Sequence, residues 1–181
     1  MPIGYAETNS SSNSSDLKTD DAICQRLLDT LRARPSTSAA ESGDAEFEKS
    51  TSGPFVASSV AAFTGRGAED TMASVRDFTQ KCPQFTSKVD GKDVSFTTGR
   101  LSIPAYGDES AAMRFTGAVD SVTVGVNLLL IRVGSAITAV EIADLGTPDV
   151  DLTQQMAARA ADKLRQVEAG ETPIPSPPPS S

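Results

Sequence analysis

Histidine is absent from the sequence, and this absence removes several kinds of chemistry. Histidine is a common general base and metal ligand, and it activates the serine or cysteine nucleophile of many hydrolases. Tryptophan is also absent, and the 181 residues include only seven Phe and two Tyr. So few aromatic side chains leave little material for cation-binding cages or base-stacking platforms. These absences argue against most hydrolase chemistry, but they do not exclude catalysis by carboxylates.

Long hydrophobic runs are missing as well. The most apolar stretch, VTVGVNLLLIRV (residues 122–133), is interrupted by Gly, Asn and Arg. It is also shorter than the roughly 20 residues that span a bilayer, so we predict no transmembrane segment in this chain. The N-terminus has no basic segment followed by an apolar one, so a signal peptide is not visible. We expect either a cytosolic protein or the mature or truncated form of an exported one.

Basic residues are the minority among charged residues. Lys and Arg total 16, Asp and Glu total 24, and the formal net charge is −8. A chain of this charge repels phosphate backbones and anionic membrane surfaces. We therefore expect no nucleic-acid partner.

The two ends of the chain differ in composition from the middle. Residues 1–18 are rich in Ser and Asn and nearly devoid of large apolar side chains, which predicts a flexible tether. Residues 170–181 are rich in Pro and Ser, which predicts a disordered tail. Residues 19–169 carry regular apolar patterns, and their number suits a single domain.

Apolar residues recur every three or four positions in three segments, which predicts three helices over residues 19–35, 66–83 and 148–170. Cys24 belongs to the apolar face of the first helix, and Cys82 lies at the end of the second. The apolar stripe predicted for the last helix consists of Leu152, Met156, Ala160, Leu164 and Val167.

Residues 83–147 switch to strand patterns. Asp90-Gly91 between alternating segments is a hairpin signal, and further turns are predicted at Asp120-Ser121 and Gly134-Ser135. Two more strands are predicted around Gly53-Pro54. Together these patterns predict an α+β fold, in which about three helices pack on an antiparallel β-sheet meander with one covered face.

Tyr106, Gly107, Asp108 and Glu109 interrupt an apolar run. Glycine permits a positive φ and aspartate bonds readily to its own backbone, so a turn explains these residues. The other interpretation is a carboxylate pair beside a tyrosine, offered to a ligand or a metal.

Arg132 lies two residues before the Gly134 turn and is expected at the rim of the sheet. We predict no catalytic residue, no metal site and no cofactor, because the acids lack calcium-loop spacing and TGRGAED lacks the Lys-Ser/Thr of a phosphate loop.

The two cysteines, Cys24 and Cys82, both lie on apolar helix faces. From the residues alone they are either one disulfide or two unrelated buried thiols. A bridge would close a loop of 82 − 24 = 58 residues. Such a loop closure stabilises a fold by roughly 4 kcal/mol in the chain-entropy model.

Five segments occur in an order that resembles a known family: CQRLLDTL, VRDFTQKCPQF, LSIPAYGDESAAMRF, VNLLLIRVGSAITAVEI and QQMAARAADKLRQV. Over about residues 20–168 the chain resembles the extracytoplasmic sensor-type domains of actinobacteria. That group includes the sensor domain of the mycobacterial kinase PknH and many free-standing lipoproteins. The most specific pieces are the two cysteines, the Gly-Asp-Glu turn and the RVG hairpin, and none of them is a catalytic signature.

The resemblance implies an α+β fold, an extracytoplasmic location, secreted or anchored at the cell surface, and a cleft for an unidentified ligand. Disulfides persist in oxidising compartments, so we predict a Cys24–Cys82 bridge. In that family a lipid-bearing cysteine sits at the mature N-terminus, and this chain shows no such cysteine.

These observations predict a non-enzymatic, sensor-like or ligand-binding domain of the cell envelope. Its partner would be a small ligand or a cell-envelope protein. Two alternatives stay open. One is an enzyme that uses carboxylates such as Asp108 and Glu109, and the other is a structural or interaction protein that docks a partner through its sheet face.

Overall fold

The computed structural model describes residues 4–7, 18–31, 39–89 and 92–173. The strands in these residues are β1 (Ala6–Glu7), β2 (Ala39–Glu48), β3 (Phe55–Phe63), β4 (Gln84–Val89), β5 (Lys92–Arg100), β6 (Glu109–Val119), β7 (Val122–Val133) and β8 (Ala136–Leu145). The helices are α1 (Ala22–Leu31), α2 (Gly67–Arg76), α3 (Phe78–Lys81) and α4 (Val150–Glu168). The α+β class is confirmed, with four helices in the described residues instead of about three.

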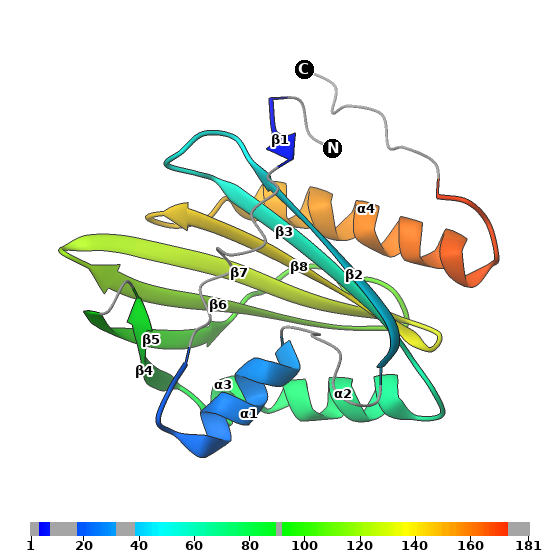
Figure 1. Cartoon of the computed structure of the whole chain (residues 1–181), viewed down its shortest axis with the longest axis horizontal. Helices are drawn as coiled ribbons and strands as arrows, with labels where there is room; N and C mark the ends of the chain where they lie inside the picture. The colour runs from blue at the N-terminus through cyan, green and yellow to red at the C-terminus, as the bar shows by residue number, and fades with distance from the viewer. Residues whose placement is uncertain (1–3, 8–17, 32–38, 90–91, 174–181) are drawn as a thin grey trace.

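The strands form one antiparallel sheet in the order β1-β2-β3-β8-β7-β6-β5-β4. β4 to β8 are consecutive neighbours, so the predicted meander is confirmed. After β3 the chain passes through α2 and α3 and starts the meander at the far edge of the sheet (Figure 1). It returns strand by strand until β8 pairs with β3, with Phe55 opposite Ala143 and Ala62 opposite Ala136.

Helices cover both faces of the sheet, so the prediction of one covered face is wrong. α1, α2 and α3 lie along one face and α4 lies along the other (Figure 1). In the central strand β7, Leu128 and Leu130 pack into the core under α1–α3, whereas Leu129 and Ile131 pack into the core under α4. The prediction followed the alternation at residues 122–127, but a continuous apolar run such as LLLI is what a strand buried on both faces requires.

A disulfide joins α1 to the end of α3 within the layer of three helices. The Sγ atoms of Cys24, in α1, and Cys82, directly after α3, are bonded, which confirms the bridge expected from the family resemblance. Both residues are buried in the core. Asp21 begins α1, because its Oδ1 accepts hydrogen bonds from the N–H groups of Ile23 at 2.8 Å and Cys24 at 2.9 Å.

The helix predicted over residues 66–83 is interrupted at Asp77, where α2 ends and α3 begins. Phe78 follows the interruption and is fully buried. Its ring packs edge-on against that of Phe115 in β6, with centroids 5.6 Å apart. The short helix α3 therefore places one large aromatic side chain against β6.

α4 differs from its predicted apolar stripe by about one position. Asp149 caps it, because Oδ1 accepts from the N–H groups of Asp151 at 2.7 Å and Leu152 at 3.3 Å. The side chains that α4 buries most deeply against the sheet are those of Thr153, Ala157, Ala161 and Leu164. Small residues at this contact let the helix axis lie close to β7 and β8. Val167, predicted in the stripe, is 53% exposed.

Most of the predicted tether and tail lies outside the described residues. Within residues 1–18, Ala6 and Glu7 form β1 and pair with Glu48 and Phe47 of β2. Tyr5 packs against the core under α4. At the other end the structure describes residues 170–173 of the predicted tail, and the flexibility of both segments stays a prediction.

Candidate functional site

The loop Tyr106–Glu109 is a turn held against the end of β7. Gly107 has a φ of +66°, the left-handed region that favours glycine. The N–H of Asp108 donates to the carbonyl of Arg132 at 2.8 Å. A Cβ on Gly107 would overlap that same carbonyl oxygen and lie 2.9 Å from Cγ2 of Ile131. Glycine is therefore required here by both conformation and space.

The carboxylate of Asp108 braces the β7–β8 turn. Its Oδ2 accepts a hydrogen bond from the N–H of Gly134 at 2.8 Å. Arg132 Nη1 lies 3.6 Å from the same oxygen and donates to the carbonyl of Gly134 at 3.1 Å. Asp108 thus ties the loop before β6 to the turn after β7.

Glu109 lies between two arginines. Its Oε1 is 3.1 Å from Arg76 Nε in α2, and its Oε2 is 3.5 Å from Arg132 Nε in β7. The side chains of Glu109 and Arg132 are only 22% and 17% exposed. These ion pairs connect the helical layer to the sheet. Both carboxylates of the loop are therefore engaged by arginine or backbone groups.

Tyr106 points toward the other layer. Its hydroxyl donates to the carbonyl of Gln154 in α4 at 3.3 Å, and its ring packs in the core under that helix. The structure therefore brings Gly107, Asp108 and Glu109 together with Arg132, and it uses Tyr106 to join the loop to α4. Each contact of this loop fits the turn interpretation.

Sequence reasoning missed a buried polar cluster beneath the start of α4. Asn127 in β7 is fully buried, and its Oδ1 accepts from Arg114 Nε at 2.7 Å. Its Nδ2 donates to Thr153 Oγ1 at 2.9 Å, and Thr153 donates to the carbonyl of Asp149 at 2.6 Å. The available signal was an asparagine inside the apolar run VNLLLI, since a buried amide needs polar partners.

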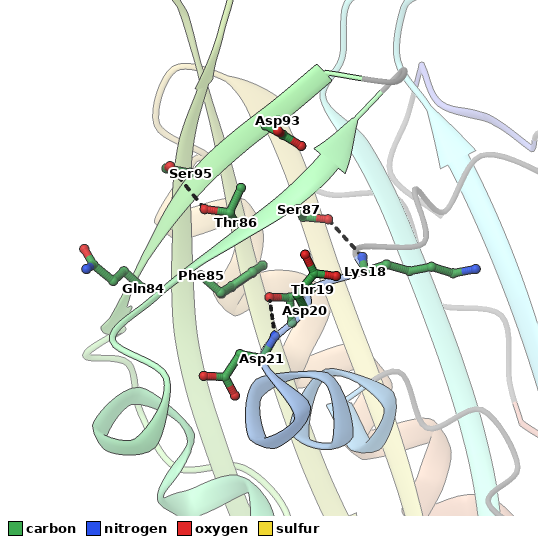
Figure 2. A pocket seen from close by; sticks show the side chains of 10 residues that line it. All are labelled: Lys18, Thr19, Asp20, Asp21, Gln84, Phe85, Thr86, Ser87, Asp93 and Ser95. Atoms are coloured by element: carbon green, nitrogen blue, oxygen red, sulfur yellow. Dashed lines mark hydrogen bonds between the residues drawn. The ribbon is translucent and has the colours of Figure 1, made fainter.

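A groove of about 660 Å³ lies between the start of α1 and the β4–β5 hairpin (Figure 2). Its lining residues are Lys18, Thr19, Asp20, Asp21, Gln84, Phe85, Thr86, Ser87, Asp93 and Ser95. Ser87 is 1% exposed, and its Oγ accepts from the N–H of Lys18 at 2.9 Å, which fixes one wall to the strand. Sequence reasoning missed this groove, because its two walls lie more than sixty residues apart in the chain.

Hydroxyl and acidic groups dominate the groove. Four of its ten residues carry hydroxyls, and the Thr86 and Ser95 oxygens lie 3.5 Å apart. Three aspartates and one lysine line the groove, so the lining carries a net charge of 1 − 3 = −2. This chemistry suits a polar or cationic ligand. Within the described ranges, no three Cys, Asp or Glu side chains gather as a metal site, and no helix is long and apolar enough to cross a bilayer.

No protein-family model matches the sequence, and no curated protein matches it either. A solved structure does match: the extracellular domain of PknH from Mycobacterium tuberculosis, with a TM-score of 0.65 and 15% sequence identity. The match covers 92% of this chain and 84% of that chain. The chain has the fold of the PknH extracellular domain. The PknH match confirms the fold that the resemblance implies, and at this identity it extends no further than the fold.

Proposed function

We propose that this chain is a non-enzymatic, sensor-like domain of the cell envelope that binds a small ligand or an envelope protein outside the cytoplasm. The shared fold with an extracellular domain over 92% of the chain carries the proposal. The Cys24–Cys82 bridge supports it, because disulfides are stable in oxidising compartments and rare in reducing ones.

The groove between α1 and the β4–β5 hairpin is the proposed binding site. It is concave, it combines several hydroxyls with a few charges, and its walls come from two different layers of the fold. Ligand sites commonly have this form, with a few polar groups placed to fix the orientation of the ligand.

The carboxylate-enzyme alternative receives less support. Asp108 contacts Gly134 and Arg132, and Glu109 contacts Arg76 and Arg132. Catalysis by a carboxylate needs an oxygen placed to reach a substrate, and these contacts hold both side chains against groups of the fold itself. We therefore assign these two residues to holding the fold.

Expression in two compartments tests whether the chain depends on the oxidising environment that the proposed location provides. We would express it once behind a cleavable export signal, into a bacterial periplasm, and once in the cytosol of the same strain. We expect the periplasmic protein to contain no free thiol and the cytosolic protein to be reduced and less stable to heat. The Cys24→Ser/Cys82→Ser double variant is the control and should behave identically in both compartments. A reduced cytosolic protein as stable as the periplasmic one would contradict the proposal.

Ligand binding is tested by chemical-shift mapping on the periplasmic protein. The probes are muropeptides and short oligosaccharides, which represent the small molecules of a cell envelope. We expect perturbed amides at Thr86, Ser87 and Ser95. Perturbation centred on Asp108 and Glu109, with turnover of the probe, would favour an enzyme instead.

A further inference from the structure

We propose that the groove takes an extended, basic segment of a partner protein, which adds to the sheet as a new strand beside β4. This inference rests on the proposed function, because it names the kind of partner that the groove binds.

The outer edge of β4 presents backbone groups that the sheet does not use. In antiparallel pairs, bonded and non-bonded positions alternate along each strand. The N–H of Thr98 donates to the carbonyl of Pro83 at 2.9 Å, so the odd-numbered residues of β4 bond to β5. The N–H and C=O groups of Gln84, Thr86 and Lys88 therefore point away from the sheet.

A second contact gives the same alternation one strand further in. The N–H of Leu101 donates to the carbonyl of Ala112 at 3.1 Å, so the odd-numbered residues of β5 direct their backbone N–H and C=O groups toward β6. The even-numbered residues of β5, including Thr98, then direct their backbone groups toward β4, in agreement with the bond from Thr98 to Pro83. Among the described residues, no strand pairs with the outer edge of β4.

The groove runs along this edge. Phe85 and Ser87 are buried toward the layer of α1–α3, whereas Gln84 and Thr86 are exposed on the opposite face, yet all four line the groove. Because the groove contacts side chains on both faces of β4, it must pass along the outer edge of that strand. Figure 2 shows the start of α1 beside the same strand.

This edge lacks two of the features that commonly block strand pairing, a proline and a β-bulge within the strand. A third feature, a lysine, is present at Lys88. β4 contains no proline, and its register with β5 is continuous from Gln84–Thr97 to Val89–Lys92. Pro83 lies just before the strand, so it leaves the outward groups of the strand open.

The acidic lining of the groove favours a basic binding partner. Asp20, Asp21 and Asp93 line the groove with a single lysine, and the chain as a whole carries a net charge of −8. A basic segment is attracted to this edge, and an acidic one is repelled. A second copy of the chain would bring the same acids against each other, so we assign the edge to a basic strand of another protein.

Binding is tested with the full chain and a defined probe: a capped eight-residue peptide of alternating Lys and Thr. We expect it to bind, with affinity that falls as salt rises. The amides of Gln84, Thr86 and Lys88 should exchange with solvent more slowly, by roughly tenfold or more, because they become hydrogen-bonded. The same peptide with Glu in place of Lys should not bind. Methylation of two adjacent central amides, which blocks both edges of the peptide, should abolish the slower exchange.

The variant Thr86→Pro removes an outward-facing N–H, a change that edge strands tolerate. We expect its affinity for the basic peptide to fall at least roughly tenfold, since pairing at the centre of β4 is blocked. Thr86→Ala keeps the N–H and is the matched control, with affinity close to wild type. Asp20→Asn should weaken binding by roughly two- to fivefold. If Thr86→Pro does not fold, the methylated peptide still decides the question on the wild-type chain.

Three results would overturn the inference. In the first the basic peptide fails to bind, and in the second it binds without slowing exchange at the β4 amides. The third result is a folded Thr86→Pro variant that binds the peptide as tightly as the wild-type chain does. A wild-type dimer that Thr86→Pro converts to a monomer would assign the edge to a second copy instead. Failure of the peptide to bind an exported, disulfide-bonded protein would leave the proposed location standing, which separates the two proposals.

Discussion

Gly107 shows how closely the loop before β6 is held against the end of β7. Its φ of +66° disfavours any other residue, and a Cβ would overlap the Arg132 carbonyl oxygen. We expect Gly107→Ala to lower the free energy of unfolding by about 2–4 kcal/mol, the sum of the backbone cost and the overlap. Urea unfolding followed by circular dichroism measures this change.

Gly65→Ala is the matched control for Gly107→Ala. Its φ is +59°, and a Cβ there meets nothing within 4 Å. It should cost only about 1 kcal/mol, the backbone part alone. Equal losses in the two variants would show that the contact with Arg132 adds nothing.

Tyr5 is a residue whose protonation the fold alters. Burial raises the pKa of Tyr5, and the negative charges of Asp144 and Asp149 raise it further. The folded state therefore favours neutral tyrosine. The resulting stabilisation is present below the unfolded pKa of about 10 and is lost as the pH rises through the folded pKa. In Tyr106→Phe, where Tyr5 is the remaining tyrosine, we expect its absorbance to titrate at higher pH in the folded than in the denatured protein.

Tyr5→Phe provides the corresponding stability measurement. This variant should lose less stability than wild type between neutral and strongly alkaline pH, since its ring cannot ionise. A folded midpoint for Tyr5 at or below the denatured one would show that the side chain does not pack under α4.

At the scale of the elements, two residues of α4 separate the contact that the structure shows from the apolar stripe that the sequence predicts. Both belong to the predicted stripe, but the structure buries only one of them. Leu164 is 4% exposed and packs with Val133 and Ala136, whereas Val167 is 53% exposed. We expect Leu164→Ala to lower the free energy of unfolding by about 2–4 kcal/mol. Val167→Ala should change it by less than about 0.5 kcal/mol. Thermal melts of both variants measure the difference, and similar losses would favour the predicted stripe.

Helices and strands with a local sequence pattern could be predicted, because the residues that form the pattern lie close together in the sequence. The meander follows from short turns such as Asp120-Ser121, and the first and last helices follow from apolar spacing. The break at Asp77 has no such signal, since the apolar spacing continues through it. The pairing of β3 with β8 has none either, because the partner residues are about eighty positions apart.

The candidate site was less predictable than the fold. Gly107 could be assigned to a turn, because glycine permits the required φ, but the partners of Glu109 come from α2 and β7 and are visible only in three dimensions. The groove is a stronger example. Residues 18–21 and the β4–β5 hairpin become neighbours only when α1 packs beside the edge of the sheet.

For the whole molecule, the Cys24–Cys82 bridge constrains a loop of 58 residues that contains β2, β3, α2 and α3. We expect the Cys24→Ala/Cys82→Ala double variant to lose up to about 4 kcal/mol of unfolding free energy. Reductant should destabilise the wild type by a similar amount and leave the double variant unchanged. Wild type that is equally stable with and without reductant would contradict this prediction, as would free thiols in the mass spectrum of the non-reduced protein.

The pairing of β3 with β8 sets the order in which the molecule can be built. After Phe63 a further 136 − 63 = 73 residues must be made before Ala136, the first residue of its partner strand, exists. At about 5–20 residues per second, β3 waits roughly 4–15 s on a growing chain for this neighbour. Both cores of the molecule include residues of β8, such as Ile137 on one face of the sheet and Val140 on the other. Neither core can therefore be complete until most of the chain has been made.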